Sequence, residues 1–276
     1  MALQRPRPSA SDDELLDTLG KLTGQVVAQS KLRQARVELA VALQHSLLPV
    51  ELPDLPGLRT AARYAPAQDG LDIGGDWYDV FWMPDNSLAF AIGDVQGHGV
   101  ESAAVMGQIR ATLRALALST TDPGEILGMA NELLVSMGTD LFVTCCLLRF
   151  HPSRLELASA RAGHVPAIWC TADGLAAIVL DEGGLPLGIQ TGERYPVTRH
   201  LLMHEGAFVL FTDGVVEGPS FPIESGLERA AEVVGAGFHS DPDLLAAEMI
   251  ELAALTGHAD DAAVLVLRHA GAGGAL

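Results

Sequence analysis

Residues 88–118 read LAFAIGDVQGHGVESAAVMGQIRATLRALAL, and this stretch joins three different local patterns. The apolar run at 88–92 predicts a strand, and the pattern at 99–118 predicts a helix. Between them, Asp94 follows Gly93 and precedes Gly97 and Gly99, and glycines let backbone and ligand approach closely. Asp94 therefore lies where a strand meets a turn, a place from which a rigid scaffold can direct a carboxylate into a cleft.

Three further stretches place an aspartate beside a glycine or another aspartate: Gly74-Gly75-Asp76, Thr212-Asp213-Gly214 and Asp260-Asp261. Each motif alone is typical of a turn or a helix cap. Together with Asp94 they predict a carboxylate cage for hard divalent cations, because Mg²⁺ and Mn²⁺ prefer oxygen ligands. Two such ions can activate a bridging water and neutralise charge on phosphoryl oxygens, so the set favours hydrolysis of phosphate esters.

The rest of the chain mixes short β-type runs with helical stretches. We expect further strands at 58–64, 77–83, 142–150, 155–160, 167–170, 176–180, 208–211 and 263–268. Asp122 and Pro123 predict the cap of a helix that ends near Met137, and two more helices are expected at 227–234 and 241–255. Because the strands and helices do not alternate steadily, they indicate an α+β fold with layered antiparallel sheets.

The N-terminal part has a different pattern. From Asp12 to about Leu48, apolar residues recur at three- and four-residue steps, which predicts a helix that Pro49 ends. Its apolar stripe is narrow, so two interpretations remain open. The helix either forms a dimer or coiled coil, or packs on its own domain.

Charge and composition exclude several classes of function. The 276 residues carry a formal net charge of −18, which argues against nucleic acid as the main partner because phosphate binding needs clustered Lys and Arg. The start does not resemble a signal peptide, and no stretch has the ~18 apolar residues needed to cross a bilayer. Cys145, Cys146 and Cys170 form no C-x-x-C motif. We expect a soluble protein of the reducing cytoplasm with buried, inert thiols.

The order of the motifs and their flanking residues point to a known family. The matching segments are Ala42–Pro49 (ALQHSLLP), Ala62–Ala67 (ARYAPA), Ile73–Asp79 (IGGDWYD), Gly93–Gly99 (GDVQGHG), Ala162–Pro166 (AGHVP), Leu185–Gly188 (LPLG), Phe211–Glu217 (FTDGVVE) and Asp260-Asp261. Over roughly residues 36–268 the chain resembles the bacterial metal-dependent protein phosphatases of the SpoIIE/RsbU type. These belong to the PPM superfamily of serine/threonine phosphatases.

The resemblance implies a β-sandwich flanked by helices, with two Mn²⁺ or Mg²⁺ ions in a cleft at one edge. It assigns Asp94 as the bridging ligand beside the backbone carbonyl of Val95, and Asp76, Asp213 and Asp260 as the remaining ligands. The substrate would be phosphoserine or phosphothreonine. A metal-activated hydroxide would attack phosphorus in line, without a covalent phosphoenzyme.

Several neighbouring acidic residues leave the ligand set open. Asp79 and Asp261 are alternatives to Asp76 and Asp260, or else carboxylates that support the site or face solvent. Glu217 either reaches the same region or lies in a turn.

Two histidines have open assignments as well. His98 is either the general acid for the leaving oxygen or a residue that hydrogen-bonds its own turn. His164 is interpreted as structural or substrate-facing rather than as a metal ligand. The chain also departs from the family at Ala262-Ala263, where a bulky residue and a threonine are common, and this weakens the expected support of the metal.

Two functions are compatible with these motifs and with the resemblance. The first is a phosphatase acting on a bacterial regulatory protein, for which the resemblance implies an anti-sigma-factor antagonist of the STAS type. The second is a weakly active or inactive binding module with a phosphatase fold in a partner-switching pathway. The predicted organisation is a disordered start (1–11), a helical linker (12–48), a phosphatase domain (49–269) and a disordered tail (270–276). Residues 32–48 are predicted to mediate a homodimer or to bind an activator.

Overall fold

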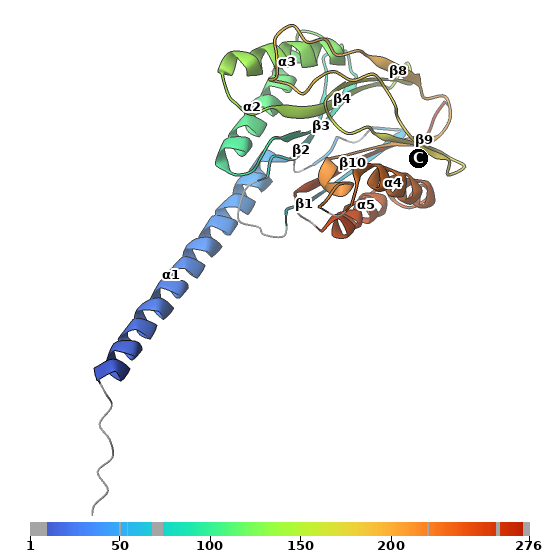
Figure 1. Ribbon diagram of the computed structural model, residues 1–276. Helices are drawn as coiled ribbons and strands as arrows, with labels where there is room; N and C mark the ends of the chain where they lie inside the picture. Colours follow the sequence, from blue (N-terminus) through green and yellow to red (C-terminus); the bar gives the residue numbers. More distant parts are fainter. Residues whose placement is uncertain are drawn as a thin grey trace, which may run out of the picture.

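The computed structural model describes residues 10–49, 51–53, 55–67, 74–219, 221–257 and 260–272. Two five-stranded antiparallel sheets lie face to face (Figure 1). In order across the first sheet, its strands are β1 (Leu58–Ala65), β10 (Ala262–His269), β9 (Gly206–Phe211), β6 (Ile168–Thr171) and β7 (Ala176–Ile178). The second contains β2 (Trp77–Trp82), β3 (Leu88–Val95), β4 (Val143–His151), β5 (Glu156–Ala162) and β8 (Thr198–Leu201). The expected α+β layered β-sandwich is confirmed.

Helices cover the outer faces of the sandwich. Helices α2 (Val100–Leu116) and α3 (Pro123–Met137) lie over the second sheet, and α4 (Ile223–Gly237) and α5 (Pro242–Thr256) lie over the first (Figure 1). A short 3₁₀ helix, η1 (Asp213–Val215), follows β9. The predicted cap of α3 is present, because the Asp122 side chain accepts hydrogen bonds from the backbone N–H groups of Gly124 and Glu125.

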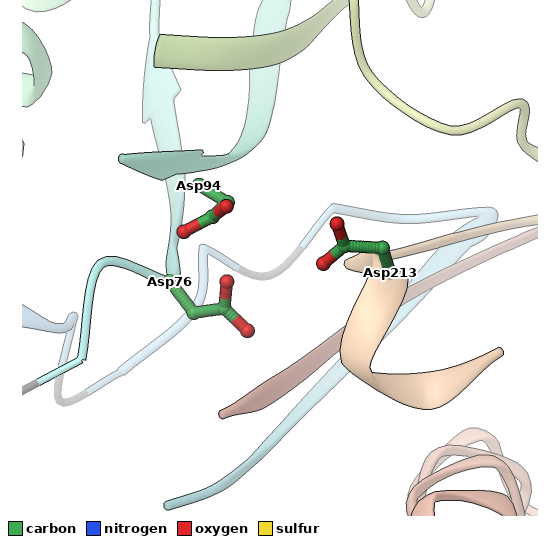
Figure 2. A group of neighbouring side chains, drawn as sticks. All are labelled: Asp76, Asp94 and Asp213. Carbon is green, nitrogen blue, oxygen red and sulfur yellow. The ribbon is translucent and has the colours of Figure 1, made fainter. Parts of the chain in front are cut away.

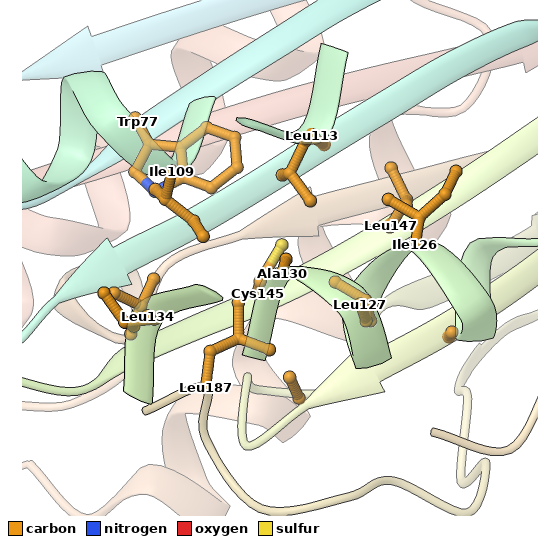
Figure 3. Close-up of a cluster of buried hydrophobic side chains, with 14 of the residues drawn as sticks. Trp77, Ile109, Leu113, Ile126, Leu127, Ala130, Leu134, Cys145, Leu147 and Leu187 are labelled. Carbon is orange, nitrogen blue, oxygen red and sulfur yellow. The ribbon is translucent and has the colours of Figure 1, made fainter. Parts of the chain in front are cut away.

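The apolar core has three parts. One lies between the second sheet and helices α2 and α3, where Trp77, Leu113 and Leu147 pack together (Figure 3). Another lies between the first sheet and helices α4 and α5, and a third fills the space between the sheets. Cys145 belongs to the first part and Cys146 to the third, because successive strand residues point to opposite faces. Both thiols are free and buried, as expected.

Helix α1 (Ala10–Leu47) extends away from the sandwich (Figure 1). It begins two residues before the predicted start, and Leu48, directly after it, packs against the core. The segments predicted to be disordered, 1–11 and 270–276, lie outside the described residues except that residues 10 and 11 begin α1 and residues 270–272 follow β10. None of the helices in the described part of the chain has both the length and the apolar character needed to cross a membrane.

The sequence predicted nine of the ten strands that the described part of the chain contains. The strand that it missed, β8, has only four residues, Thr198–Leu201, and alternates partly buried with exposed side chains. It pairs with β5 at the edge of the second sheet. A short run that contains Arg199 and His200 has little apolar signal, so pairing with β5 rather than local sequence defines this strand.

Candidate metal centre

Three of the predicted aspartates meet at one end of the sandwich. Asp94 lies near the end of β3, Asp76 directly precedes β2, and Asp213 begins η1 after β9. One carboxylate oxygen from each lies within 4.8 Å of the other two. Figure 2 shows the three carboxylates directed into a shared space from separate parts of the chain. Residues that are far apart in sequence thus form one acidic cluster.

Close contact between two backbone segments sets the geometry at Asp76 and Asp94. The Val95 N–H donates to the Gly75 carbonyl over 3.2 Å. A Cβ atom on Gly75 would lie 2.1 Å from the Val95 carbonyl oxygen and 2.7 Å from Asp94 Oδ1. Only glycine fits here. The Val95 carbonyl, predicted as a backbone ligand, therefore lies beside Asp94 and the residue before Asp76.

A threonine outside the predicted set of site residues orients Asp76. Thr212 Oγ1 donates a hydrogen bond of 2.7 Å to Asp76 Oδ2 and accepts one of 2.8 Å from the Ala263 N–H. Nothing in the local pattern could reveal a contact between residues so far apart in sequence; only the fold brings Thr212 to Asp76.

The two adjacent aspartates before β10 have different surroundings. Asp261 is buried and accepts a 2.8 Å hydrogen bond from the Ala67 N–H as well as one from the Tyr64 hydroxyl. Asp260 is exposed, and its Oδ1 accepts from the Asp261 N–H over 2.9 Å. Asp260 lies outside the compact cluster of three, but its charge acts on both Asp94 and Asp213.

Asp79 lies in a separate ion-pair cluster. It is fully buried on the face of β2 that packs against α2, and Arg114 donates two hydrogen bonds of 2.6 Å to it. Arg110 Nε lies 3.1 Å from Asp79 Oδ2. Asp76 and Asp79 are an odd number of residues apart, so their side chains point to opposite faces. The structure therefore places Asp76, and not Asp79, in the acidic cluster.

His98 and Glu217 lie at the periphery, and both are exposed. Burial raises the pKa of Asp261, and the hydrogen bonds from Ala67 and Tyr64 and the charge of His98 oppose this rise. His98 is therefore close enough to the acidic groups to act on them. The charge of Glu217 contributes to a raised pKa of Asp213, after burial and Asp260.

His164 is buried within the sandwich. Its Nδ1 lies 2.9 Å from Thr144 Oγ1, and its Nε2 lies 3.1 Å from the Phe211 carbonyl oxygen. Burial lowers the pKa of His164 to about 3, so the ring is neutral. The structure places it between two strands, away from solvent, which agrees with a structural interpretation.

The cluster concentrates negative charge in a partly buried environment. Burial, with the charges of Asp213 and Asp260, raises the pKa of Asp94 to about 7. Burial, with the charges of Asp94 and Asp261, raises the pKa of Asp76 well above its usual range. Carboxylates that repel one another in this way are stabilised by a divalent cation. The set of oxygen donors therefore fits Mg²⁺ or Mn²⁺.

Comparisons with known proteins identify relatives of this chain. The family model described as Stage II sporulation protein E (SpoIIE) matches residues 84–270, a range that includes Asp94, Asp213 and Asp260. The phosphoserine phosphatase RsbU of Bacillus subtilis is 27% identical over 185 residues, which are 67% of this chain and 54% of RsbU. Protein IcfG of Synechocystis is 25% identical over 244 residues, 78% of this chain and 38% of IcfG. The chain thus spans about half of RsbU and less of IcfG.

Solved structures share the fold. The RsbU and RsbW domains of Rv1364c from Mycobacterium tuberculosis are 32% identical with a TM-score of 0.71, over 82% of this chain and 63% of that chain. The SiaA-PP2C domain of Pseudomonas aeruginosa has a TM-score of 0.71 at 22% identity, over 87% of this chain and 98% of that one. The family model matches more than half of the residues of this chain. The chain therefore belongs to the SpoIIE family, and it has a PP2C-type phosphatase fold.

Proposed function

We propose that this protein hydrolyses phosphoserine or phosphothreonine in a bacterial regulatory protein. The proposal rests on the cluster of Asp76, Asp94 and Asp213, whose carboxylate oxygens lie within 4.8 Å of one another. Such a cluster suits cation-assisted phosphoryl transfer to water. The names of the relatives RsbU and RsbP, both phosphoserine phosphatases, support the same reaction class.

In this proposal Asp76, Asp94, Asp213 and Asp260, with the Val95 carbonyl, would hold two Mn²⁺ or Mg²⁺ ions. When bound, the ions would supply the Lewis acid that activates water and offsets charge on the phosphoryl oxygens. The chain itself keeps the oxygen donors together before the ions arrive. The Thr212 hydroxyl orients Asp76.

His98 is proposed as the proton donor to the leaving serine or threonine oxygen. Its support is its exposed position near Asp261, at the edge of the acidic cluster, where a phosphorylated side chain of another protein could reach it. A general acid needs access to the leaving oxygen, and an exposed side chain at the edge of the cluster has that access.

The proposed substrate is an anti-sigma-factor antagonist of the STAS type, and the proposed compartment is the cytoplasm. One of the similar solved structures combines RsbU and RsbW domains, and another belongs to work on the bacterial stressosome. These names support a role in partner switching. Free, buried Cys145, Cys146 and Cys170 fit a reducing compartment.

We also propose that the N-terminal helix is a site for a second copy or an activator. The segment predicted for this role covers residues 32–48. Apolar side chains at least 49% exposed extend further along α1, at Leu15, Leu16, Leu19, Leu22, Val26, Val27 and Leu32. A lone helix with this many exposed apolar side chains gains stability by packing against a partner.

The proposed reaction is tested with a phosphoserine peptide and added Mn²⁺, with phosphate release as the measurement. We expect hydrolysis that stops in excess chelator and in the Asp94→Asn variant. Asp173→Asn, a matched change on the exposed β6–β7 turn, should leave the rate unchanged. Full activity in chelator or in Asp94→Asn would contradict the mechanism. Failure to bind Mn²⁺ at millimolar concentration in calorimetry would favour a docking function instead.

The helix proposal has its own test. A chain that begins at Pro49 is compared with the full chain by light scattering and by phosphate release. We expect fewer chains per particle or a changed rate, and the same number of chains per particle together with the same rate would contradict a role for α1.

A further inference from the structure

We propose that His164 is a positioning residue that sets the spacing between Asp94 and Asp213, and thereby the affinity of the centre for its cations. This inference rests on the proposed function of the same site. It concerns the segment 162–166, AGHVP, whose histidine has no place in the reaction described above. We call the two hydrogen bonds of its ring, to Thr144 and to Phe211, the His164 bridge.

The first end of the His164 bridge lies next to Asp94. Thr144 in β4 is the direct cross-strand partner of Asp94 in β3. Directly opposed residues of an antiparallel pair point to the same face of the sheet. Cys145 packs toward helices α2 and α3, so Thr144 and Asp94 face the other sheet. The Thr144 hydroxyl, 2.9 Å from His164 Nδ1, therefore ties the ring to the strand pair that carries Asp94.

The second end lies two residues before Asp213. His164 Nε2 is 3.1 Å from the carbonyl oxygen of Phe211, the last residue of β9. A carbonyl can only accept, so Nε2 carries the proton and Nδ1 accepts from the Thr144 hydroxyl. Burial keeps the ring neutral, which allows one nitrogen to donate while the other accepts. One side chain thus joins the two sheets at the level of the acidic cluster.

The sequence around His164 explains why a side chain is needed at this point. Strands β6 and β9 pair with Ile168 opposite Val209 and Trp169 opposite Phe208. Continuing this register by two residues places Pro166 opposite Phe211. Proline has no backbone N–H, so β6 offers no donor at that position. The Nε2–H of His164 supplies the hydrogen bond that the strand does not.

The backbone of the segment is held in place on both sides of the ring. Arg161 donates a 2.7 Å hydrogen bond to the His164 carbonyl and pairs with Asp181 at 3.0 Å. The Gly163 N–H donates to the Gly184 carbonyl over 2.8 Å. Gly163 has a φ of +63° and packs against Pro186, where a Cβ would lie 2.4 Å from Pro186 Cγ. Because the segment is fixed in this way, the ring can transmit a constant spacing to both strands.

This spacing matters because the cluster is shared between the sheets. Asp76 and Asp94 come from the ends of β2 and β3, whereas Asp213 follows β9 of the opposite sheet (Figure 2). Cation affinity depends steeply on the separation of carboxylates, and loss of a residue that orients metal ligands typically reduces affinity about 10–100-fold. Loss of either hydrogen bond of the His164 bridge should therefore lower the affinity for cations.

The test measures Mn²⁺ binding by calorimetry on the full chain, independently of activity. Thr144→Val keeps the side-chain volume but removes the hydroxyl, and His164→Gln retains a donor toward Phe211 while losing the acceptor for Thr144. Each variant should bind Mn²⁺ about 10-fold or more weakly. Both changes remove the same hydrogen bond. The double variant should therefore bind Mn²⁺ as tightly as whichever single variant has the lower affinity.

The control separates positioning from general stability. Val234→Ala removes apolar contacts in α4, within the core on the far side of the first sheet. It should lower the melting temperature while leaving Mn²⁺ affinity unchanged. The proposal is overturned if Thr144→Val and His164→Gln bind Mn²⁺ like the parent chain, or if their effects simply add. A parent chain that binds Mn²⁺ but hydrolyses no phosphoserine peptide would instead contradict the proposed function and leave these binding comparisons valid.

Discussion

Thr212 Oγ1 donates a 2.7 Å hydrogen bond to Asp76 Oδ2 and so connects the end of β9 in one sheet to the residue before β2 in the other. The same hydroxyl accepts from the Ala263 N–H at 2.8 Å. All three residues are buried. The buried Thr212 hydroxyl therefore fixes one carboxylate oxygen of Asp76, Oδ2.

Replacement of Thr212 by valine should weaken cation binding. The variant keeps the shape of the side chain but leaves Asp76 without its donor, and lost support of a ligand typically costs about 10–100-fold in affinity. Calorimetric titration with Mn²⁺ measures the effect. Thr212→Ser, which keeps the hydroxyl, is the matched control and should bind within a few-fold of the parent chain. Equal affinity in the valine variant and the parent would show that Thr212 does not orient Asp76.

Replacement of Gly75 by alanine should disrupt the centre through the backbone. The new Cβ would lie 2.1 Å from the Val95 carbonyl oxygen, so the end of β3 must move. We expect both Mn²⁺ affinity and hydrolysis of the phosphoserine peptide to fall sharply. Gly128→Ala is a suitable control because its Cβ would lie in α3, 3.9 Å from the nearest backbone oxygen, Glu193 O. That change should raise stability by up to about 1 kcal/mol; an equally harmless Gly75→Ala would contradict the geometry.

Asp79→Asn should affect folding rather than cation binding. The change replaces the buried carboxylate beside Arg110 and Arg114 with a neutral amide. Removal of one partner of a buried ion pair lowers the free energy of unfolding by about 3–5 kcal/mol. Since Arg110 and Arg114 keep partial access to solvent, the lower end is expected. Urea unfolding measures the loss. The folded protein should still bind Mn²⁺ with parental affinity, whereas a selective loss of binding without loss of stability would make Asp79 a ligand.

Stability at acidic pH should depend on His269. Burial lowers the pKa of His269 to about 4, against an unfolded value of about 6.5. Between these two values the unfolded chain binds a proton that the folded chain excludes, so stability falls as the pH decreases from about 6.5 to about 4. The slope from this one group is at most about 1.4 kcal/mol per pH unit.

His269→Phe removes the titrating group and can still stack on Trp169, whose ring lies 5.4 Å from that of His269. Urea unfolding at several pH values should show a shallower acid slope in this variant than in the parent chain. His204→Gln, on the exposed segment after β8, provides the control and should keep the parental slope. Parallel curves for the parent chain and His269→Phe would count against the prediction.

The sequence was sufficient for most of the fold because its β-type runs are short, apolar and bounded by Gly, Pro and Asp. Strand β8 was not predictable, since its four residues, Thr198–Leu201, become a strand only by pairing with β5. The helices were predictable from their caps, for example Asp122 before α3. Local patterns thus identified elements, whereas the partner of each strand came from the tertiary structure.

The candidate site was predictable to a similar degree. Motif order identified Asp76, Asp94 and Asp213, which the structure brings together. The choice between Asp76 and Asp79 needed the strand register, because Asp79 turns to Arg114 on the opposite face. Thr212 could not be found from the sequence, since its role depends on a hydrogen bond to a residue in the other sheet.

Because the carboxylates come from both sheets, cation binding and the packing of the two sheets are thermodynamically linked. Ions that bind only the closed sandwich would stabilise it by RT ln(1 + [ion]/Kd), so the melting temperature would rise with ion concentration. Linkage is reciprocal. A protein or small molecule that loosens the contact between the sheets would weaken the affinity for cations. The cations would weaken the binding of that molecule by the same factor. Such a molecule would regulate the centre without contacting any of the aspartates.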